Sequence, residues 1–114
     1  NSYVFTSETC ALDIIGAKFV REVDNGEIVY VEDDQLKSIK PFPPKKVRPC
    51  VFEYIYFARP DSILDGKTAY EHRKNIGKEL AKENDIDADI VVPVPDSGNA
   101  AALGFAQHLK MNFE

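Results

Sequence analysis

The stretch from Val91 to Ala102 is the part of the sequence best suited to chemistry. A β-branched run ends in the turn Pro95-Asp96-Ser97-Gly98, and an alanine-rich segment typical of a helix follows. In α/β proteins, such a connection points backbone N–H groups and a helix N-terminus at one spot, which favours an anion there. The Ser97 hydroxyl could add a hydrogen-bond donor or a metal ligand. These residues alone favour an ordinary turn with Asp96 or Ser97 as the helix N-cap, because no named phosphate-loop pattern is present, and a phosphate site is the alternative.

Two cysteines and two histidines are the other candidate ligands. Cys50 follows Pro49 and precedes an aromatic, apolar segment, so its default interpretation is a small buried hydrophobe. One ligand of a metal cluster is the alternative, although the sequence has no Cys-x-x-Cys pair. The same default applies more strongly to Cys10. His72 and His108 have no cysteine or acid at a metal-binding spacing, and we expect both at exposed helix positions.

Composition limits the function classes. A chain of 114 residues is enough for one small domain or for pieces of two. The net charge of −5 gives no basic face, so a nucleic-acid partner is not expected. No apolar run is long enough to cross a bilayer, so no membrane partner is expected either. Two cysteines are too few for a disulfide framework, and free thiols suit a cytoplasmic protein.

The first forty residues look rich in strands. Asn25-Gly26 predicts a tight turn, and the turn at 32–35 should close a hairpin. Ser7 is a candidate N-cap for a single helical turn at 10–12. The strands predicted from β-forming residues cover 3–6, 17–23, 28–31 and 36–39.

A proline-rich stretch divides the sequence. Residues 41–49 contain four prolines, which remove backbone donors and favour an extended linker, so we place a domain boundary there. A long surface loop inside one domain is the alternative. Beyond it, the sequence predicts a short buried helix at 50–58, a turn at Asp65-Gly66, a helix at 69–83 capped by Thr68, a buried strand at 90–94 and a helix at 99–109. Arg59 is expected to pair with a nearby acid, with an anion contact as the alternative.

Several motifs resemble those of one enzyme family. Ser7–Asp13, Gly26–Ile28, Phe52–Ser62 and Val92–Gly98 occur in the order found in glutamine phosphoribosylpyrophosphate amidotransferases, also called amidophosphoribosyltransferases. The block Tyr-Phe-Ala-Arg-Pro-Asp-Ser within the third motif is highly specific. The resemblance covers nearly the whole chain and corresponds to the middle of such an enzyme.

The resemblance implies a fold class of α+β followed by α/β. Residues 1–40 would be the end of an N-terminal-nucleophile glutaminase domain, and 41–49 the linker. Residues 50–114 would begin a type I phosphoribosyltransferase domain. The parent enzyme would release ammonia from glutamine and use it to displace pyrophosphate from phosphoribosylpyrophosphate. The product, phosphoribosylamine, begins purine biosynthesis.

The resemblance also implies roles for individual residues. Asp96, Ser97 and Gly98 would belong to the loop that binds phosphoribosylpyrophosphate and its pyrophosphate group, with Ser97 at the Mg²⁺ ion. Tyr56 would lie at the domain interface where ammonia passes. Cys50 matches a ligand of the [4Fe-4S] cluster found in one branch of the family. A homo-oligomer is expected, because a strand at 90–94 without its sheet would expose unpaired edges.

The family's catalytic cysteine stands at the mature N-terminus, whereas this sequence begins Asn1-Ser2. We therefore expect no catalytic residue in this stretch and no activity from it alone. A non-catalytic interaction or scaffold module is the alternative function. A type I phosphoribosyltransferase without a glutaminase is a weaker one, and the motif Ser7–Asp13 argues against it.

Overall fold

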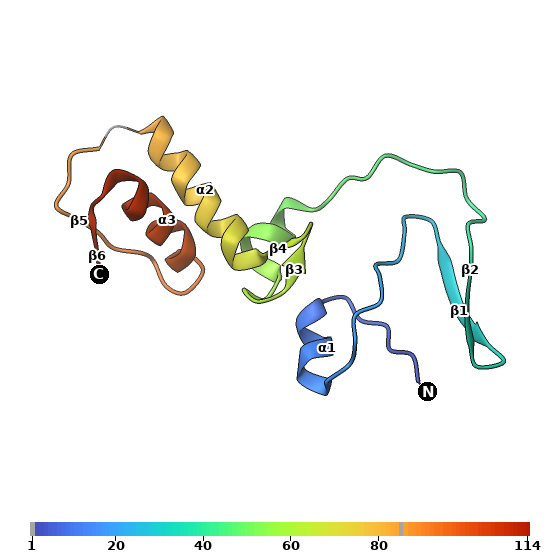
Figure 1. The fold of residues 1–114 in the computed structure, drawn as a ribbon. Coiled ribbons are helices and arrows are strands. Elements are labelled where there is room, and N and C mark those ends of the chain that lie inside the picture. Colours follow the sequence, from blue (N-terminus) through green and yellow to red (C-terminus); the bar gives the residue numbers. More distant parts are fainter. Residues whose placement is uncertain (1, 85) are drawn as a thin grey trace. The chain divides into compact units, whose positions relative to one another are not determined.

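The computed structural model describes residues 2–84 and 86–114 (Figure 1). The chain divides into two compact units, Asn1–Pro49 and Cys50–Glu114, here called unit 1 and unit 2. Both contain helix and strand, so the fold is mixed α and β. No helix among the described residues is long and apolar enough to span a bilayer.

Unit 1 contains one helix and one hairpin. Helix α1 spans Thr9–Ile15, and strands β1 (Ile28–Glu32) and β2 (Gln35–Ile39) pair antiparallel. Asp33 and Asp34 form the hairpin turn with positive φ angles of 51° and 58°. Aspartate tolerates this left-handed backbone better than most residues, and two such residues suit the twist of a hairpin. The predicted hairpin and the turn at Asn25-Gly26 are confirmed.

Other predictions for unit 1 are wrong. Residues 3–6 and 17–23 are not strands. The β-forming side chains there were the only signal, and a strand also needs a neighbour to accept its backbone hydrogen bonds. The helix starts one residue before the single turn predicted at 10–12 and runs three residues beyond it. Its N-cap is Glu8 rather than Ser7, with no side-chain cap bond.

A polar cluster joins the segment before the hairpin to the hairpin itself. The Glu27 carboxylate accepts two hydrogen bonds from the Arg21 guanidinium, at 2.7 and 2.8 Å, and one from the Asp24 N–H at 2.8 Å. The Glu27 side chain is only 2% exposed. Chiefly through Arg21, then through the Asp24 N–H and the Ser38 hydroxyl, the pKa of Glu27 falls to about 2. Lys40 pairs with Asp24 at 2.6 Å, which raises the pKa of Lys40.

We expect Glu27→Gln to remove a pH-dependent part of the stability of unit 1. Because folding lowers this pKa from 4.5 to about 2, the stabilisation is fully present above about pH 4.5. It is lost as the pH falls through about 2. Hydrogen exchange of the β1–β2 amides between pH 2 and 6 measures this, with the exposed Glu22→Gln as control. Equal pH profiles for the Glu27→Gln and unchanged proteins would contradict the assignment.

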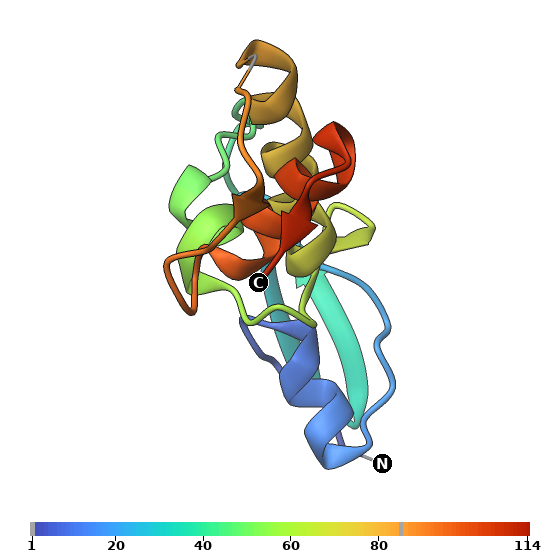
Figure 2. The same cartoon turned by 90° about the vertical axis from the view of Figure 1, so that its left-hand side faces the viewer.

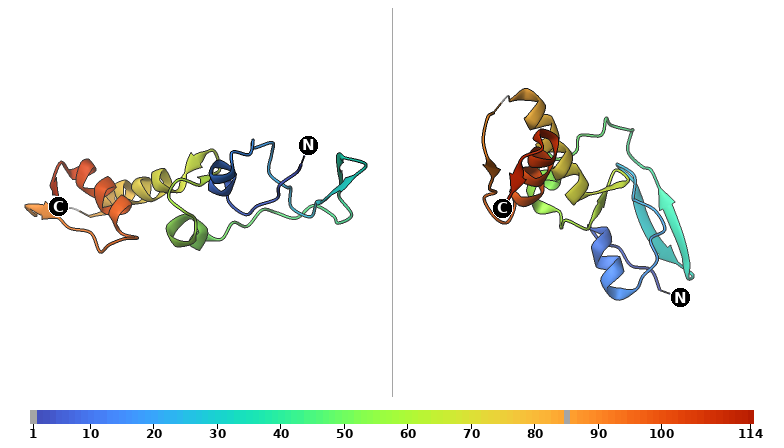
Figure 3. Two further views of the ribbon diagram at one scale, coloured as in Figure 1. Left: turned by 90° about the horizontal axis from the view of Figure 1, so that it is seen from below. Right: turned by 60° about the vertical axis from the view of Figure 1, so that its left-hand side comes forward.

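Unit 2 is built on two helices that lie side by side (Figures 1 and 3). Helix α2 spans Ala69–Glu83, as predicted, and α3 spans Asn99–Leu109. Thr68 caps α2 with a reciprocal arrangement: its hydroxyl accepts from the Glu71 N–H, and the Glu71 carboxylate accepts from the Thr68 N–H. The Thr68 N–H and the Thr68 hydroxyl both donate to the Glu71 carboxylate, which lowers the pKa of Glu71.

Small side chains form the core of unit 2. Because the residues at the helix contact are small, the two backbones approach closely. A Cβ atom added at Gly77 would lie 1.8 Å from the Ala101 carbonyl oxygen, and one at Gly104 would lie 1.9 Å from that of Lys74. The helices therefore run antiparallel along this contact. The buried apolar residues are Ala58, Ala69, Ala81, Ala100 and Ala106.

The segment before α2 is helical over residues 51–57, as predicted, but it is not buried. Residues Glu53–Phe57 form a single π-helical turn, η1, closed by a hydrogen bond of 3.0 Å from the Ala58 N–H to the Glu53 carbonyl oxygen. Its aromatic side chains are largely exposed, and none of its residues is buried. Strands β3 (Ile63–Leu64) and β4 (Lys67–Thr68) follow as a hairpin around Asp65-Gly66, which confirms that turn.

The strand before α3 is shorter and more exposed than predicted. Strand β5 spans Ile90–Val91 and pairs in parallel with β6 (Asn112–Phe113), which follows α3 (Figure 2). One edge of β5 is therefore paired, contrary to the expectation of two unpaired edges. The predicted buried strand is wrong for this unit, since Val92 and Val94 are 67% and 81% exposed.

Candidate functional site

An apolar groove of about 520 Å³ in unit 2 brings together two residues that the sequence singled out separately. Tyr56 comes from η1, and Ser97 comes from the loop before α3. They are far apart in the sequence, and the packing of α2 against both η1 and α3 brings their segments to one place. The lining consists of aromatic, aliphatic and small residues with one arginine and one serine: Phe52, Ile55, Tyr56, Arg73, Ile76, Ser97, Gly98 and Ala101.

The loop before α3 has the geometry of a tight turn into a helix. The Gly98 N–H donates to the Val94 carbonyl oxygen at 3.1 Å, and the Asn99 N–H donates to that of Asp96 at 3.2 Å. Gly98 occupies the N-cap position, where no side chain caps the helix. The interpretation of Asp96 or Ser97 as the N-cap is therefore wrong. The Pro95–Asp96 peptide bond is cis.

This loop leaves two polar side chains available. Asp96 and Ser97 are both exposed, and neither side chain has a hydrogen-bond partner within the described part of the chain. A Cβ at Gly98 would lie 2.6 Å from the Val94 carbonyl oxygen, so only glycine permits this turn. The loop thus presents a hydroxyl and a carboxylate beside the N-terminus of α3, whose partial positive charge favours anions.

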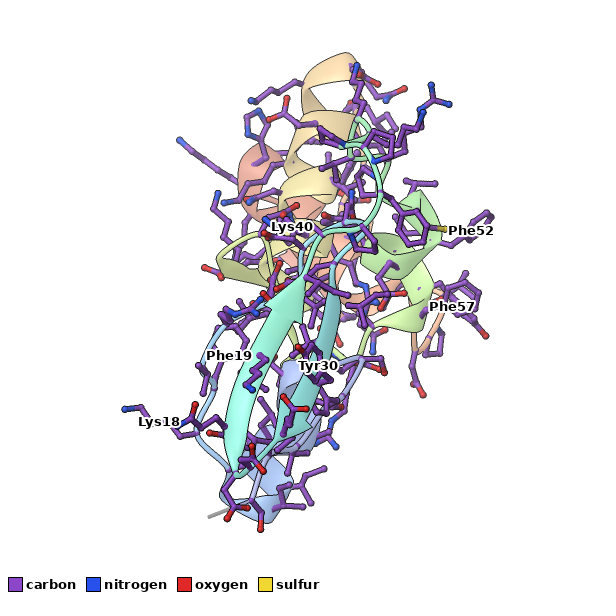
Figure 4. The ribbon with its side chains drawn as sticks, turned by 90° about the vertical axis from the view of Figure 1, so that its right-hand side faces the viewer. Lys18, Phe19, Tyr30, Lys40, Phe52 and Phe57 are labelled. Carbon is purple, nitrogen blue, oxygen red and sulfur yellow. The ribbon has the colours of Figure 1, made fainter. Side chains whose placement is uncertain are left out.

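Tyr56 lies on an exposed aromatic surface. Its side chain is 66% exposed, and its ring meets that of Phe57 edge-on at 5.7 Å. The Phe52 and Phe57 rings lie 6.2 Å apart, and both project from the η1 region (Figure 4). These aromatic side chains make the η1 side of the groove largely apolar.

Sequence reasoning missed Arg73, which lines the same groove. This residue is 8% exposed, and its guanidinium donates to two backbone carbonyl oxygens of the η1 region. The buried positions of α2 recur every four residues, at Ala69, Arg73, Gly77 and Ala81. An arginine inside a stripe of small residues was the signal that could have identified it.

The remaining candidates show mixed outcomes. Cys10 is buried, as expected of a small hydrophobe, whereas Cys50 is exposed and its default interpretation is wrong. His108 is exposed as predicted. His72 is half-buried, with Nε2 2.9 Å from the Leu64 carbonyl oxygen and its ring edge-on to that of Tyr54. Arg59 pairs with Asp61 at 2.9 Å, which confirms the predicted ion pair.

The residues on this chain fit a metal only in part. A [4Fe-4S] cluster takes four thiolates, and the sequence has two cysteines, so Cys50 could supply only one ligand. The described residues contain no group of three or more histidine, cysteine, aspartate or glutamate side chains placed to hold a metal. Ser97 and Asp96 suit Mg²⁺ as partial ligands, since that ion keeps waters and takes oxygens from bound phosphates.

Comparison with known proteins defines the class. No family model matches the chain. It is 56% identical over 97% of its length to an amidophosphoribosyltransferase of Rhizobium etli, and 44% identical over all of its length to that of Bacillus subtilis. The solved structure of the B. subtilis glutamine phosphoribosylpyrophosphate amidotransferase with ADP and GMP matches with a TM-score of 0.90 and 44% identity, over 95% of this chain and 24% of that one.

The fold and the matched motifs therefore correspond to one segment of glutamine-dependent phosphoribosyl-transferring enzymes. Over nearly its whole length the chain matches part of the amidophosphoribosyltransferases, and the resemblance predicted from its motifs is confirmed. It spans about a quarter of the length of the curated relatives that it matches: 23% for R. etli and 24% for B. subtilis.

Proposed function

We propose that the complete gene product is an amidophosphoribosyltransferase that makes phosphoribosylamine from phosphoribosylpyrophosphate and glutamine-derived ammonia. This is the first step of purine biosynthesis. The observation that carries the proposal is the 44–56% identity to such enzymes over nearly the whole chain. In this proposal, unit 1 belongs to a glutaminase domain of the N-terminal-nucleophile type, and unit 2 begins a type I phosphoribosyltransferase domain.

The transfer step follows from the chemistry of the substrates. The lone pair of ammonia attacks C1 of the ribose, and the C1–O bond to pyrophosphate breaks. Pyrophosphate leaves with the electron pair, and the new amine loses one proton to solvent. Negative charge therefore develops on the leaving oxygen, and donors aimed at that oxygen accelerate the step.

The loop Asp96-Ser97-Gly98 is our candidate for those donors. Exposed Ser97 directly precedes Gly98, the N-cap of α3, and a hydroxyl beside a helix N-terminus suits a pyrophosphate group. Mg²⁺, when bound, would offset the charge of the leaving group. Ser97 would supply one oxygen ligand to it, and most of the others would come from substrate and water.

The groove is our candidate for the route of ammonia. Tyr56 lies at one part of its lining and Ser97 at another, and most of the wall between them is apolar. An apolar wall favours neutral ammonia over ammonium because the charged form loses hydration. Ammonia released from glutamine would thus reach the transfer site without protonation in bulk water.

Two further assignments belong to the same proposal. Exposed Cys50 would supply one thiolate of a [4Fe-4S] cluster whose other ligands lie outside this chain. The protein would act as a homo-oligomer in the reducing cytosol, where cysteines such as Cys10 do not form disulfides.

The test compares two nitrogen sources in the complete gene product. We expect phosphoribosylamine to form with Mg²⁺ and phosphoribosylpyrophosphate from either glutamine or ammonium salts, with one glutamate released per product in the first case. Pyrophosphate release measures transfer, and glutamate measures hydrolysis. If neither pyrophosphate nor glutamate forms above a blank without enzyme, a non-catalytic scaffold is favoured. Transfer from ammonia alone would favour a phosphoribosyltransferase without a glutaminase.

A further inference from the structure

Arg73 is a buried cation without an acidic partner among the described residues. Its exposed fraction is 8%, and no carboxylate lies within ion-pair distance of it in the part of the chain described here. Burying a charged side chain is costly unless it is hydrogen-bonded. The burial of Arg73 therefore depends on the acceptors that its guanidinium meets, which are backbone carbonyl oxygens.

The hydrogen bonds of Arg73 hold one short segment from both sides. Nε donates to the Tyr54 carbonyl oxygen at 2.8 Å, and Nη2 donates to that of Ala58 at 2.7 Å. These carbonyls lie two residues before and two residues after Tyr56. A π-helical turn is a rare conformation, and the planar guanidinium can hold two acceptors in fixed geometry.

The two ends of this segment have other contacts: the Tyr54 hydroxyl donates to the Asp65 carboxylate, the Tyr54 ring lies edge-on to that of His72, and Ala58 is buried. Every residue of η1 keeps some exposure, and the Tyr56 side chain is 66% exposed. The two hydrogen bonds from Arg73 add a direct hold on the backbone on both sides of Tyr56. Since α2 also packs tightly on α3, the same arginine links the Tyr56 segment to the helix that follows the Ser97 loop.

We propose that Arg73 is a positioning residue that fixes η1 so that Tyr56 and the apolar groove stay aligned with the Ser97 loop. The inference rests on the proposed function, since alignment matters for the passage of ammonia between two reactions. Arg73 touches no reacting atom in this proposal. Loss of its hydrogen bonds should uncouple the two reactions rather than abolish either.

The experiment uses Arg73→Met in the complete gene product, with Lys82→Met as the matched loss of an exposed cation from the same helix. We expect glutamine-dependent phosphoribosylamine synthesis to fall about ten-fold, because a misplacement of about 1 Å can cost up to about 100-fold. Glutamine hydrolysis and ammonia-dependent synthesis should stay within about two-fold, since neither uses the passage. Lys82→Met should leave all three rates unchanged.

A second readout tests positioning without reference to activity. In Arg73→Met, amide hydrogen exchange should accelerate about ten-fold at residues 53–58, the effect of about 1.4 kcal/mol, and stay constant in α3. Unchanged exchange at 53–58, or an unchanged rate of glutamine-dependent synthesis, overturns the inference.

If Arg73→Met does not fold, the Arg73→Lys variant provides the test. Lysine has one ammonium and cannot hold both carbonyls in a fixed fork. A folded Arg73→Lys protein in which only glutamine-dependent synthesis falls, by less than in Arg73→Met, supports a positioning role. A parallel loss of all three rates, or no loss of glutamine-dependent synthesis, overturns it. Failure of the unsubstituted protein to make phosphoribosylamine would instead refute the proposed function.

Discussion

Gly77→Ala should weaken the packing of α2 on α3 by about 3 kcal/mol or more, at the upper end of overpacking costs. Helix propensity alone predicts the opposite, since alanine in a helix interior is favoured over glycine by about 1 kcal/mol. The tertiary contact decides the sign. The new Cβ would lie 1.8 Å from the Ala101 carbonyl oxygen, which is backbone and cannot rotate away. The helices would have to separate and lose contact along the small-residue core.

Gly104→Ala repeats the test from the other helix. Its Cβ would meet the Lys74 carbonyl oxygen at 1.9 Å, so a loss of similar size is expected. The two substitutions act on one contact, and once the helices have separated the second adds little, so the double variant should lose less than the sum. Hydrogen exchange of α2 and α3 amides in the complete gene product measures the local stability. Glu79→Ala, on the exposed face of α2, should change it by less than about 0.5 kcal/mol.

Slower exchange in Gly77→Ala, as propensity alone predicts, would contradict the close helix contact. Exchange equal to that of Glu79→Ala would do the same. Full additivity of Gly77→Ala and Gly104→Ala would show that the two glycines lie in separate contacts rather than in one.

Local signals explain which parts of the fold could be predicted. The Thr68 cap, the turn at Asp65-Gly66 and the hairpin at 28–39 depend on residues near in sequence, and each formed as expected. Residues 3–6 and 17–23 carry equally good β-forming side chains. They are not strands, because a strand also depends on a partner that the local pattern does not specify.

Burial was harder to predict than element type. The apolar run at 50–58 gave no periodicity to choose a helix face, and it became a π-helical turn with exposed aromatic rings. The apolar residues of α2 fit one helical face only loosely in the sequence, and of these Gly77 and Ala81 are buried, whereas Ile76 and Leu80 are exposed. Small residues occupy the contact with α3 because the two backbones approach closely there.

The candidate site was predictable in its parts but not in its assembly. The strand–turn–helix pattern around Ser97 follows from local residue types, and Tyr56 entered only through the family resemblance. That both line one groove depends on how α2 packs against η1 and α3. Arg73 acquires its role only from carbonyl groups far away in the sequence, which residue types do not reveal.

Ser97→Ala in the complete gene product should lower kcat/KM for phosphoribosylpyrophosphate by about 100-fold, the loss typical of removing one donor to a developing oxyanion. The hydroxyl is exposed beside the N-terminus of α3 and has no hydrogen-bond partner among the described residues, so it is available to a pyrophosphate oxygen or to Mg²⁺. Both nitrogen sources should be affected equally, because the loss lies in the transfer step. Glutamine hydrolysis should stay measurable, since it takes place at a different site. This pattern differs from that of Arg73→Met, which spares synthesis from ammonia.

Ser97→Thr is the matched control, because it keeps a hydroxyl and should recover most of the lost activity. Gln107→Ala, at an exposed position of α3 away from the loop, should change nothing. Raising the Mg²⁺ concentration should partly rescue Ser97→Ala if the hydroxyl is a metal ligand, and should have no effect if it only donates to pyrophosphate, since mass action restores a weakened metal site. Unchanged phosphoribosylamine synthesis in Ser97→Ala would remove the loop from the transfer site. An equal loss in Ser97→Thr would assign the effect to loop shape, because the hydroxyl would then be present without restoring activity.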